Sequence, residues 1–561
     1  MSAHGDEARR RLTMRRFVEA CEALRATSKK TLKVARVSEL FQALPLDDAA
    51  IAAIFLTGRP FAHRDERVLG VGGSQLAKIV AQLAGADSAD LGKSYRAHGD
   101  LGDMAEHLLL KRHSTADVSL KHVSQTFDRL VGARSSAQKM ALIKTLFEPM
   151  SAAEVKYAIK IMTGDLRIGL KESLVEEAIA QAFDRPVDAV RRANMLTGDI
   201  GETLRSAAAN GLDAVRIRLF HPIGFMLATP VESADEILSG GTGSVLAEEK
   251  YDGIRAQLHK GPAGVKIFSR TLDEIVEFPE LNSAFAALPG ELILDGEILA
   301  WNGARPLPFT ELQKRLGRKQ LDLWLQHEIP VRFAAFDLLY QDGELLLDEP
   351  LEKRRALLEK KLEKILPPAG TAPLYVAPAI RCESVEAIQE AFRNALTAGH
   401  EGIVVKRPES FYTPGRRGRS WFKLKEPFAT LDVVVTAVEY GHGKRHGLLS
   451  DYTFSVRDGH RLLTVGKAYS GLTDAEIKTG TAYFLEHTIE DFGARRTVQP
   501  TVVIEVAFNN IQKSDRHQSG YALRFPRILR LRPDKPVAEI DTLARVAELY
   551  ARQVTLPRNS S

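Results

Sequence analysis

The pattern of apolar and polar residues predicts helices over the first 220 residues. Ser151 and Glu154 have the spacing of a capping box at a helix start. Apolar residues then recur at helical intervals, first at Val155, Ala158, Ile159 and Met162 and, after the interruption at Gly164-Asp165, at Val175, Ile179, Ala182 and Phe183. There is no repeat of fixed period, which favours an irregular all-α domain over a solenoid.

From residue 221 to 427 the pattern becomes one of strands mixed with helices. Apolar residues alternate on both sides of the turn-forming segment 261–264, which predicts a β-hairpin built on Ile254, Ala256, Leu258, Val265 and Ile267. Amphipathic helices are interspersed, for example around Lys353 to Leu362. This mixture predicts an α+β domain with mostly antiparallel strand pairing.

After residue 428 short strands dominate. Strands are predicted at 431–440, 452–456, 462–465 and 502–508, with an Asp458-Gly459 turn between the second and the third. Several short strands in about 130 residues fit a small barrel, for which the OB-fold is the candidate. The predicted domains are therefore 1–220, 221–427 and 428–561, with short junctions near His221-Pro222 and Pro427 that suit domains moving about hinges.

Composition adds limits to this picture. A length of 561 residues exceeds one ordinary core, and a net charge of +5 is compatible with a polyanionic partner without requiring one. Two cysteines, Cys21 and Cys382, exclude a four-cysteine zinc module and a disulfide framework. No apolar run approaches the roughly 18 residues of a membrane span, so we expect a cytoplasmic protein, nucleoid-associated in a prokaryote.

Several short motifs carry candidate chemistry, and each has an ordinary structural explanation when taken alone. Lys250-Tyr251-Asp252-Gly253 fits a strand-edge lysine before a turn. Asp295-Gly296-Glu297 ends the strand-like run at 292–294 and fits a turn with solvated carboxylates. Phe336-Asp337 follows an apolar run, and Glu401 and Lys406 end a buried-looking strand. Lys423 and Lys425 share one face of a strand, while Arg524 to Lys535 forms a basic stripe.

Together, in this order and at these separations, the motifs resemble those of covalent lysine nucleotidyltransferases, and most closely the ATP-dependent DNA ligases of the three-domain type. The resemblance extends from 248–255 and Ser269-Arg270 to the last motif at 522–535, and the segment 164–170 is similar to a signature of the family's helical DNA-binding domain. It implies an all-α DNA-binding domain, an antiparallel α+β nucleotidyltransferase (ATP-grasp-like) domain and an OB-fold domain, with ATP and Mg²⁺ as cofactors.

The resemblance also implies a role for each motif residue. Lys250 attacks the α-phosphate of ATP and carries AMP as a phosphoramidate. The ATP-binding residues are Glu248 on the adenine amino group, Phe336 stacked on the ring, Arg255 and Arg270 on ribose and phosphate, and Arg417, Lys423 and Lys425 on the α-phosphate. Glu297 and Glu401 are the metal ligands, with ribose binding an open alternative for Glu297.

Two further sets of residues are expected to act outside the nucleotide site. Arg532 and Lys535 of the last domain would close over ATP and orient the departing pyrophosphate. Gly164, Arg167 and Gly169 would contact DNA phosphates, since a nick is recognised through backbone contacts. The expected partner is nicked duplex DNA and the expected state a monomer. No sliding-clamp motif is evident near either end.

Three alternatives share part of this pattern. A GTP-dependent capping enzyme shares the lysine chemistry, but the large helical domain disfavours it. An NAD-dependent ligase is disfavoured because its zinc cysteines are absent. A non-catalytic nick-binding scaffold is disfavoured because the lysine, both acids and the motif lysines are intact.

The nucleophilic lysine must be a neutral amine in order to attack the phosphate. A lysine with a pKa near 10.4 is neutral in about one molecule in a thousand at pH 7.4.

Overall fold

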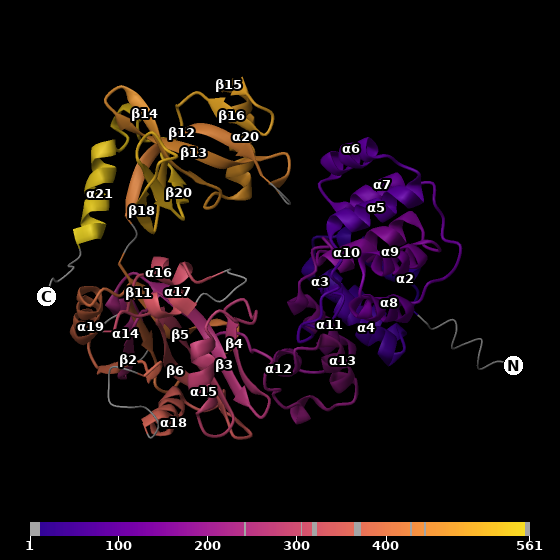
Figure 1. Ribbon diagram of the computed structural model, residues 1–561, viewed down its shortest axis with the longest axis horizontal. Helices are drawn as coiled ribbons and strands as arrows, with labels where there is room; N and C mark the ends of the chain where they lie inside the picture. The colour runs from indigo at the N-terminus through magenta and orange to yellow at the C-terminus, as the bar shows by residue number, and fades with distance from the viewer. Residues whose placement is uncertain are drawn as a thin grey trace. The chain divides into compact units, whose positions relative to one another are not determined.

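The computed structural model describes residues 12–239, 243–303, 306–316, 323–363, 372–426, 429–441 and 445–555. The chain divides into two compact units (Figure 1). One comprises Met1–Ala395 and His400–Leu424, and the other Leu396–Gly399 and Lys425–Ser561. The predicted junction at Pro427 lies outside the described residues. The division of the chain into three domains therefore stays a prediction.

The first part of unit 1 is built from helices, as the hydrophobic pattern predicts. They are α2 (Met14–Arg25), α3 (Lys30–Ala43), α4 (Leu46–Leu56), α5 (Gly73–Ala84), α6 (Ser88–His98), α7 (Leu101–Leu108), α8 (Leu120–Gly132), α9 (Ser136–Phe147), α10 (Ala152–Thr163), α11 (Glu172–Ala182), α12 (Val187–Thr197), α13 (Ile200–Ala208) and the 3-10 turn η1 (Leu212–Ala214).

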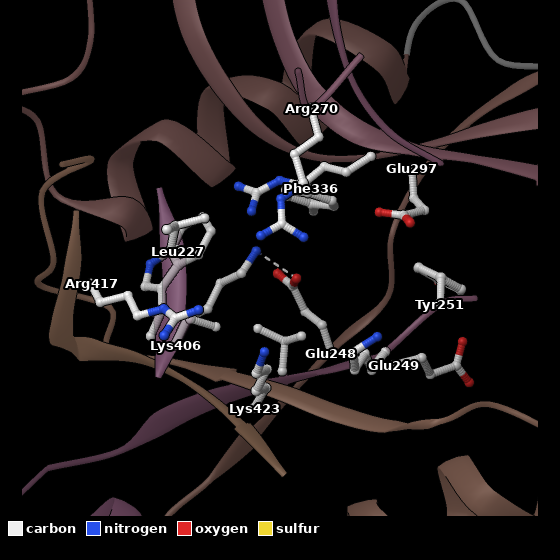
Figure 2. Close-up of a pocket in the computed structure, with 15 residues that line it drawn as sticks. Leu227, Glu248, Glu249, Tyr251, Arg270, Glu297, Phe336, Lys406, Arg417 and Lys423 are labelled. Carbon is white, nitrogen blue, oxygen red and sulfur yellow. Dashed lines mark ion pairs between the residues drawn. The ribbon is translucent and has the colours of Figure 1, made fainter. Parts of the chain in front are cut away.

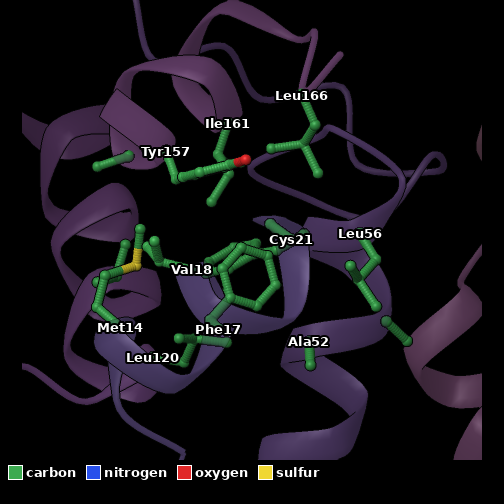
Figure 3. Close-up of a cluster of buried hydrophobic side chains, with 14 of the residues drawn as sticks. Met14, Phe17, Val18, Cys21, Ala52, Leu56, Leu120, Tyr157, Ile161 and Leu166 are labelled. Atoms are coloured by element: carbon green, nitrogen blue, oxygen red, sulfur yellow. The ribbon is translucent and has the colours of Figure 1, made fainter. Parts of the chain in front are cut away.

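Helix α10 begins where the sequence predicts. The Ser151 hydroxyl accepts a hydrogen bond from the Glu154 amide at 3.3 Å, and the Glu154 carboxylate accepts one from the Ser151 amide at 2.8 Å. This capping box satisfies amides that have no partner inside the helix. The buried face of α10 joins a core cluster with α2 and α4, in which Phe17, Leu56 and Tyr157 take part (Figure 3).

The loop between α10 and α11 is held in an irregular backbone conformation. Gly164, Arg167 and Gly169 have φ of +84°, +53° and +63°, in the left-handed region that favours glycine. Leu166 and Ile168 are buried and anchor the loop to the helical core. Arg167, which lies between them, is 42% exposed in its side chain.

A short segment connects the helices to the sheets and is bonded to both. The Phe220 amide donates to Nδ1 of His259 at 3.2 Å. Gln257 accepts from the Ile223 amide at 3.0 Å and donates to its carbonyl at 2.7 Å. His221 packs so closely on the helical side that a Cβ added to Gly198 would lie 2.0 Å from its ring. The segment is therefore fixed along much of its length.

Two sheets complete unit 1. The first has the order β1 (Leu227–Val231), β11 (Arg417–Lys425), β10 (Gly402–Lys406), β2 (Val245–Glu249), β9 (Ala379–Cys382). The second has the order β4 (Gly264–Ser269), β3 (Ile254–Gly261), β5 (Leu292–Ala300), β6 (Val331–Gln341), β7 (Glu344–Leu345), with β8 (Leu374–Val376) beside β6. The accompanying helices are α14 (Ala234–Leu238), α15 (Pro279–Ala286), α16 (Phe309–Gln313), α17 (Leu323–Glu328), α18 (Leu351–Glu363) and α19 (Val385–Thr397).

These sheets confirm the predicted α+β pattern and correct one of its details. The hairpin of β3 and β4 is present, and pairing is mostly antiparallel, with parallel pairs at β1–β11 and β6–β8. The prediction that Asp295-Gly296-Glu297 ends a strand is wrong, because β5 continues to Ala300 and Asp295 is fully buried. Phe336-Asp337, which follows an apolar run in the sequence, lies inside β6.

Unit 2 contains the predicted strands. They are β12 (Thr430–Tyr440), β13 (Leu449–Asp458), β14 (Arg461–Ala468), β15 (Thr488–Asp491), β16 (Arg495–Val498), β17 (Val503–Ala507), β18 (Asn510–Lys513), β19 (Tyr521–Arg524) and β20 (Arg527–Leu531). The sheet runs β14-β13-β12-β16-β15, with β17 joining β12 to β20. Among the described residues no ladder closes this sheet into a barrel.

Unit 2 also holds helices that the sequence pattern did not predict, α20 (Asp474–Glu486), α21 (Leu543–Thr555) and the turn η3 (Val537–Glu539). Helix α20 starts with a capping box formed by Thr473 and Glu476, a signal that the sequence offered. In neither unit do the described helices include one with the length and apolar composition needed to cross a membrane.

Candidate functional site

A pocket in unit 1 is lined by residues of both sheets (Figure 2). Strands β2, β10 and β11 of the first sheet and β3, β5 and β6 of the second contribute side chains to it. Of the residues that the sequence singled out for ATP, the lining includes Glu248, Lys250, Arg255, Arg270, Glu297, Phe336, Arg417 and Lys423. Segments almost 180 residues apart in the chain therefore meet around one cavity.

Lys250 follows β2 directly and is fixed by its own backbone. Its amide donates to the Gly402 carbonyl at 2.8 Å, and its carbonyl accepts from the Glu401 amide at 3.2 Å. The side-chain amine forms an ion pair with the Glu401 carboxylate, with both groups partly buried. Gly402 has φ of +141°, which L side chains rarely adopt, so the glycine after the acid is required by the turn into β10.

The glycines of two motifs are explained by close packing. A Cβ on Gly253 would lie 2.3 Å from the carbonyl oxygen of Ile298 in β5. A Cβ on Gly296 would lie 2.4 Å from the ring of Phe333 in β6. Both distances are far shorter than van der Waals contact. Strand β5 can therefore approach the start of β3, and β6 the centre of β5, only where the residue at the contact is glycine.

Glu248 lines the pocket as a buried carboxylate with two cationic partners. Its Oε1 accepts from Nη1 of Arg355 at 2.9 Å, and Oε2 is 2.6 Å from the Lys406 amine. The Lys406 amine also lies 4.3 Å from the ring centroids of Phe336 and Trp421. Burial raises the pKa of Glu248, while Lys406 and Arg355 act in the opposite direction.

Arg255 is held by a carboxylate that the sequence motif suggested was exposed. Asp295 is fully buried and accepts two hydrogen bonds from the Arg255 guanidinium at 3.1 and 2.7 Å. The Tyr412 hydroxyl donates to the same carboxylate at 2.7 Å, and Arg255 also donates to the Met226 carbonyl at 2.6 Å. The pKa of Arg255 is raised, because the Asp295 charge outweighs burial. The guanidinium is therefore oriented before any ligand arrives.

Glu297 projects from β5 into the pocket. Burial raises its pKa to about 8, although the charges of Lys250 and Arg255 act to lower it. A carboxylate in this position gains stability from any additional cation brought into the pocket.

Several predicted residues lie away from the pocket wall. Lys425 and Glu401 are not among its lining residues within the described chain, although Glu401 reaches the Lys250 amine. In unit 2, Arg532 and Lys535 pair with Asp432, at 2.9 and 2.6 Å. Arg532 pairs in addition with Asp534 at 2.9 Å. These two cations are therefore already neutralised by carboxylates of their own unit.

In the helical part, Arg167 forms ion pairs with Asp165 at 3.0 Å and Asp100 at 3.3 Å. A second hollow adjoins this loop and is lined by Arg167, Asp165, Asp100, Thr163 and the start of α5 at Gly73. Gly164 and Gly169, the other residues predicted to contact DNA, flank Arg167 in the sequence, and both have a left-handed backbone.

Sequence reasoning missed Arg355, which contacts Glu248 from α18. A signal was available, because Arg355 takes a position in the apolar stripe formed by Leu351, Leu358 and Leu362. A charged residue in such a stripe indicates a buried partner. Trp421, which lines the pocket together with Phe336, was likewise not singled out from the sequence.

Comparison with known proteins relates the sequence of this chain to one enzyme family. Family models match in sequence order: DNA ligase N terminus over residues 13–180, ATP dependent DNA ligase domain over 225–425, and ATP dependent DNA ligase C terminal region over 445–535. A probable DNA ligase of Koribacter versatilis is 50% identical over 96% of this chain and 97% of its own length. The chain belongs to the ATP-dependent DNA ligase family.

More distant relatives extend the match. A DNA ligase of Archaeoglobus fulgidus is 34% identical over 97% of this ligase and 99% of its own length. The solved structure named Pmar-Lig_PreS3 superposes with a TM-score of 0.58 over 92% of this chain and 99% of its own, at 17% identity, a likeness of fold alone. The known activity of the family joins DNA through a lysine–AMP intermediate formed from ATP, and this ligase is an enzyme of that kind.

Proposed function

We propose that this ligase seals nicks in duplex DNA and that Lys250 is the residue that carries AMP. The observation that carries the assignment is the position of the Lys250 amine. It extends into a pocket that also presents a buried acid, an aromatic ring and several cations, at Glu248, Phe336, Arg270, Arg417 and Lys423. This combination offers recognition of a base, stacking and binding of phosphates around one nucleophile.

In this scheme the pocket residues divide the nucleotide among them. Glu248 accepts from the adenine amino group and Phe336 stacks on the ring. Arg255, pre-oriented by Asp295, and Arg270 bind ribose and phosphate. Arg417, Lys423 and Lys425, all on β11, stabilise the charge on the α-phosphate. They do so while the Lys250 nitrogen bonds to phosphorus and pyrophosphate departs.

Glu297 and Glu401 fit Mg²⁺ by the chemistry of their donors. Mg²⁺ is commonly held by one or two carboxylates, with water and phosphate oxygens completing its shell. Both acids lie close enough to Lys250 to sense its charge, Glu401 by direct pairing and Glu297 through its pKa. Among the described residues no group of three or more His, Cys, Asp or Glu side chains that could hold a metal ion is present. Bound there, Mg²⁺ would offset the charge of the triphosphate. Ribose binding stays open for Glu297.

We further propose that unit 2 is an OB-fold whose basic stripe assists the departure of pyrophosphate through Arg532 and Lys535. Because both residues are paired with Asp432, binding of pyrophosphate would require them to exchange a carboxylate for a phosphate. The helical part would bind the DNA backbone, with Gly164, Arg167 and Gly169 in the exposed loop after α10. After adenylation, AMP passes to the 5′ phosphate of the nick and the 3′ hydroxyl displaces it.

The decisive experiment is incubation with ATP labelled at the α-phosphate, followed by denaturing electrophoresis. We expect Lys250→Ala to form no labelled protein, yet to seal a nick that already carries AMP on its 5′ phosphate. Lys353→Ala is the matched control, because this exposed lysine on α18 pairs with Glu349, which lies just before that helix. Label retained by Lys250→Ala through denaturation would assign the nucleophile to another residue.

A further inference from the structure

The carboxylate of Glu248, in the wall of the pocket, is held between two cations. The side chain is 4% exposed, and each oxygen has its own partner, Arg355 at 2.9 Å and Lys406 at 2.6 Å. A carboxylate has about four lone-pair positions, so both oxygens can still accept a hydrogen bond from a ligand. Glu248 therefore faces the nucleotide as a pre-paired acceptor.

Arg355 is fixed independently of the nucleotide. Its Nη2 donates to the Ala377 carbonyl at 2.6 Å, and its Nε donates to Glu359, one turn further along α18, at 2.8 Å. The side chain is 10% exposed. Because three of its nitrogens bond to three different groups, the guanidinium has one orientation, and that orientation directs Nη1 at Glu248.

The two cations differ in how dependably they hold Glu248 in its charged form. Burial lowers the pKa of the Lys406 ammonium, whereas a guanidinium keeps its charge at any pH of interest. Another charged group near Glu248 is Asp337 of β6, which accepts two hydrogen bonds from Arg354 at 2.7 and 2.8 Å. Arg355 is therefore the permanent positive charge beside Glu248.

We propose that Arg355 is a positioning residue that sets the choice of nucleobase, by keeping Glu248 an ionised, acceptor-only group. This inference rests on the proposed contact between Glu248 and the base. An ionised carboxylate accepts from the 6-amino group of adenine, but it meets the 6-oxo group of guanine or hypoxanthine as one acceptor against another. A protonated carboxyl could donate to the 6-oxo group, and the discrimination would be lost.

The test compares self-labelling by ATP and by ITP, each labelled at the α-phosphate. ITP is chosen because it lacks the 2-amino group of GTP and so confines the change to the 6-position edge. The quantity measured is the ratio of the two second-order labelling constants. A site built around a hydrogen bond typically rejects the mismatched analogue by a large factor, on the order of 10⁴. We expect the ratio to fall at least about tenfold in Arg355→Met.

Conservative and control variants separate this role from a merely structural one. Arg355→Lys retains a cation and should keep the ratio within about threefold of the unaltered protein. Lys353→Met, an exposed change on the same helix, should leave the ratio unaltered. In Arg355→Met the ratio should rise between pH 6 and pH 9 as Glu248 ionises, whereas in the unaltered protein it should stay flat. A general loss of structure would lower both labelling rates together and give no such profile.

Glu248→Gln distinguishes failure of this inference from failure of the proposed base contact. The amide can donate to a 6-oxo group, so its ratio should collapse without any pH dependence. A collapse in Glu248→Gln with an unchanged, pH-independent ratio in Arg355→Met would overturn the role of Arg355 and leave the base contact standing. An unchanged ratio in Glu248→Gln would remove the base contact and this inference with it. If Arg355→Met does not fold, Arg355→Gln is decisive on the same criterion.

Discussion

Acidification should weaken unit 1 through His221, the buried residue of the segment between helices and sheets. Burial lowers its pKa from 6.5 to about 4, and the nearby His63, Arg64 and Arg218 contribute in the same direction against Asp199. In the unfolded chain the imidazole keeps its ordinary value. Between these two pKa values the unfolded state therefore binds more protons, and stability is lost as the pH falls below about 6.5.

The magnitude follows from the two pKa values. A difference of one pKa unit corresponds to 1.36 kcal/mol, so the full effect is about 3 kcal/mol and is reached below pH 4. At about pH 5 roughly 2 kcal/mol of it should already be lost, while at about pH 7.5 the loss is close to zero. This is a substantial share of the stability of an ordinary domain.

The measurement is urea unfolding followed by tryptophan fluorescence. All three tryptophans, Trp301, Trp324 and Trp421, lie in the part of the chain that carries the sheets. His221→Gln provides the comparison, since other titrating groups such as His259 are common to both proteins. The difference in unfolding free energy between them should shift by about 2 kcal/mol in favour of the variant on going from pH 7.5 to pH 5. A difference that stays constant with pH would refute the reasoning.

Three other substitutions test the site. Asp295→Asn leaves the Arg255 charge largely buried without its counterion, so we expect a loss of about 3–5 kcal/mol in urea unfolding and impaired ATP labelling; unchanged stability would contradict the pairing. Gly253→Ala forces a Cβ against β5 and should cost about 1–3 kcal/mol and displace Lys250, which labelling at saturating ATP would detect. Replacing Arg532 and Lys535 by alanine should impair self-labelling far more than sealing of a pre-adenylated nick, and equal losses would make them general DNA contacts.

Local patterns predicted local structure well. The capping box at Ser151 and the alternation around segment 261–264 specify their elements through contacts a few residues apart, and both predictions are confirmed. The buried state of Gln257 and His259 was not predictable from the same alternation, because it depends on the segment at Phe220 folding back over β3.

For the candidate site, too, the sequence predicted the motif residues but not their tertiary contacts. Motif order indicated that residues between Glu248 and Lys425 serve one chemistry. Of those assigned to the nucleotide or the metal, all but Glu401 and Lys425 line one pocket. The motifs did not indicate that Asp295 is buried and paired with Arg255. The sequence Asp-Gly-Glu is equally typical of an exposed turn. The partner that neutralises a buried charged residue depends on tertiary packing, which cannot be predicted from the neighbouring residues in the sequence.

The antiparallel pairing of β2 with β10 has a consequence for insertions and deletions. Read from N to C, both segments present an acid before a lysine, Glu248 and Lys250 on one and Glu401 and Lys406 on the other. Because the strands run in opposite directions, each acid meets the lysine of its neighbour, and two ion pairs form across a single ladder. One residue inserted within β10 would turn either Glu401 or Lys406 to the opposite face while disrupting the register. A length change there would thus damage nucleophile and base pocket together, whereas a point substitution can affect one alone.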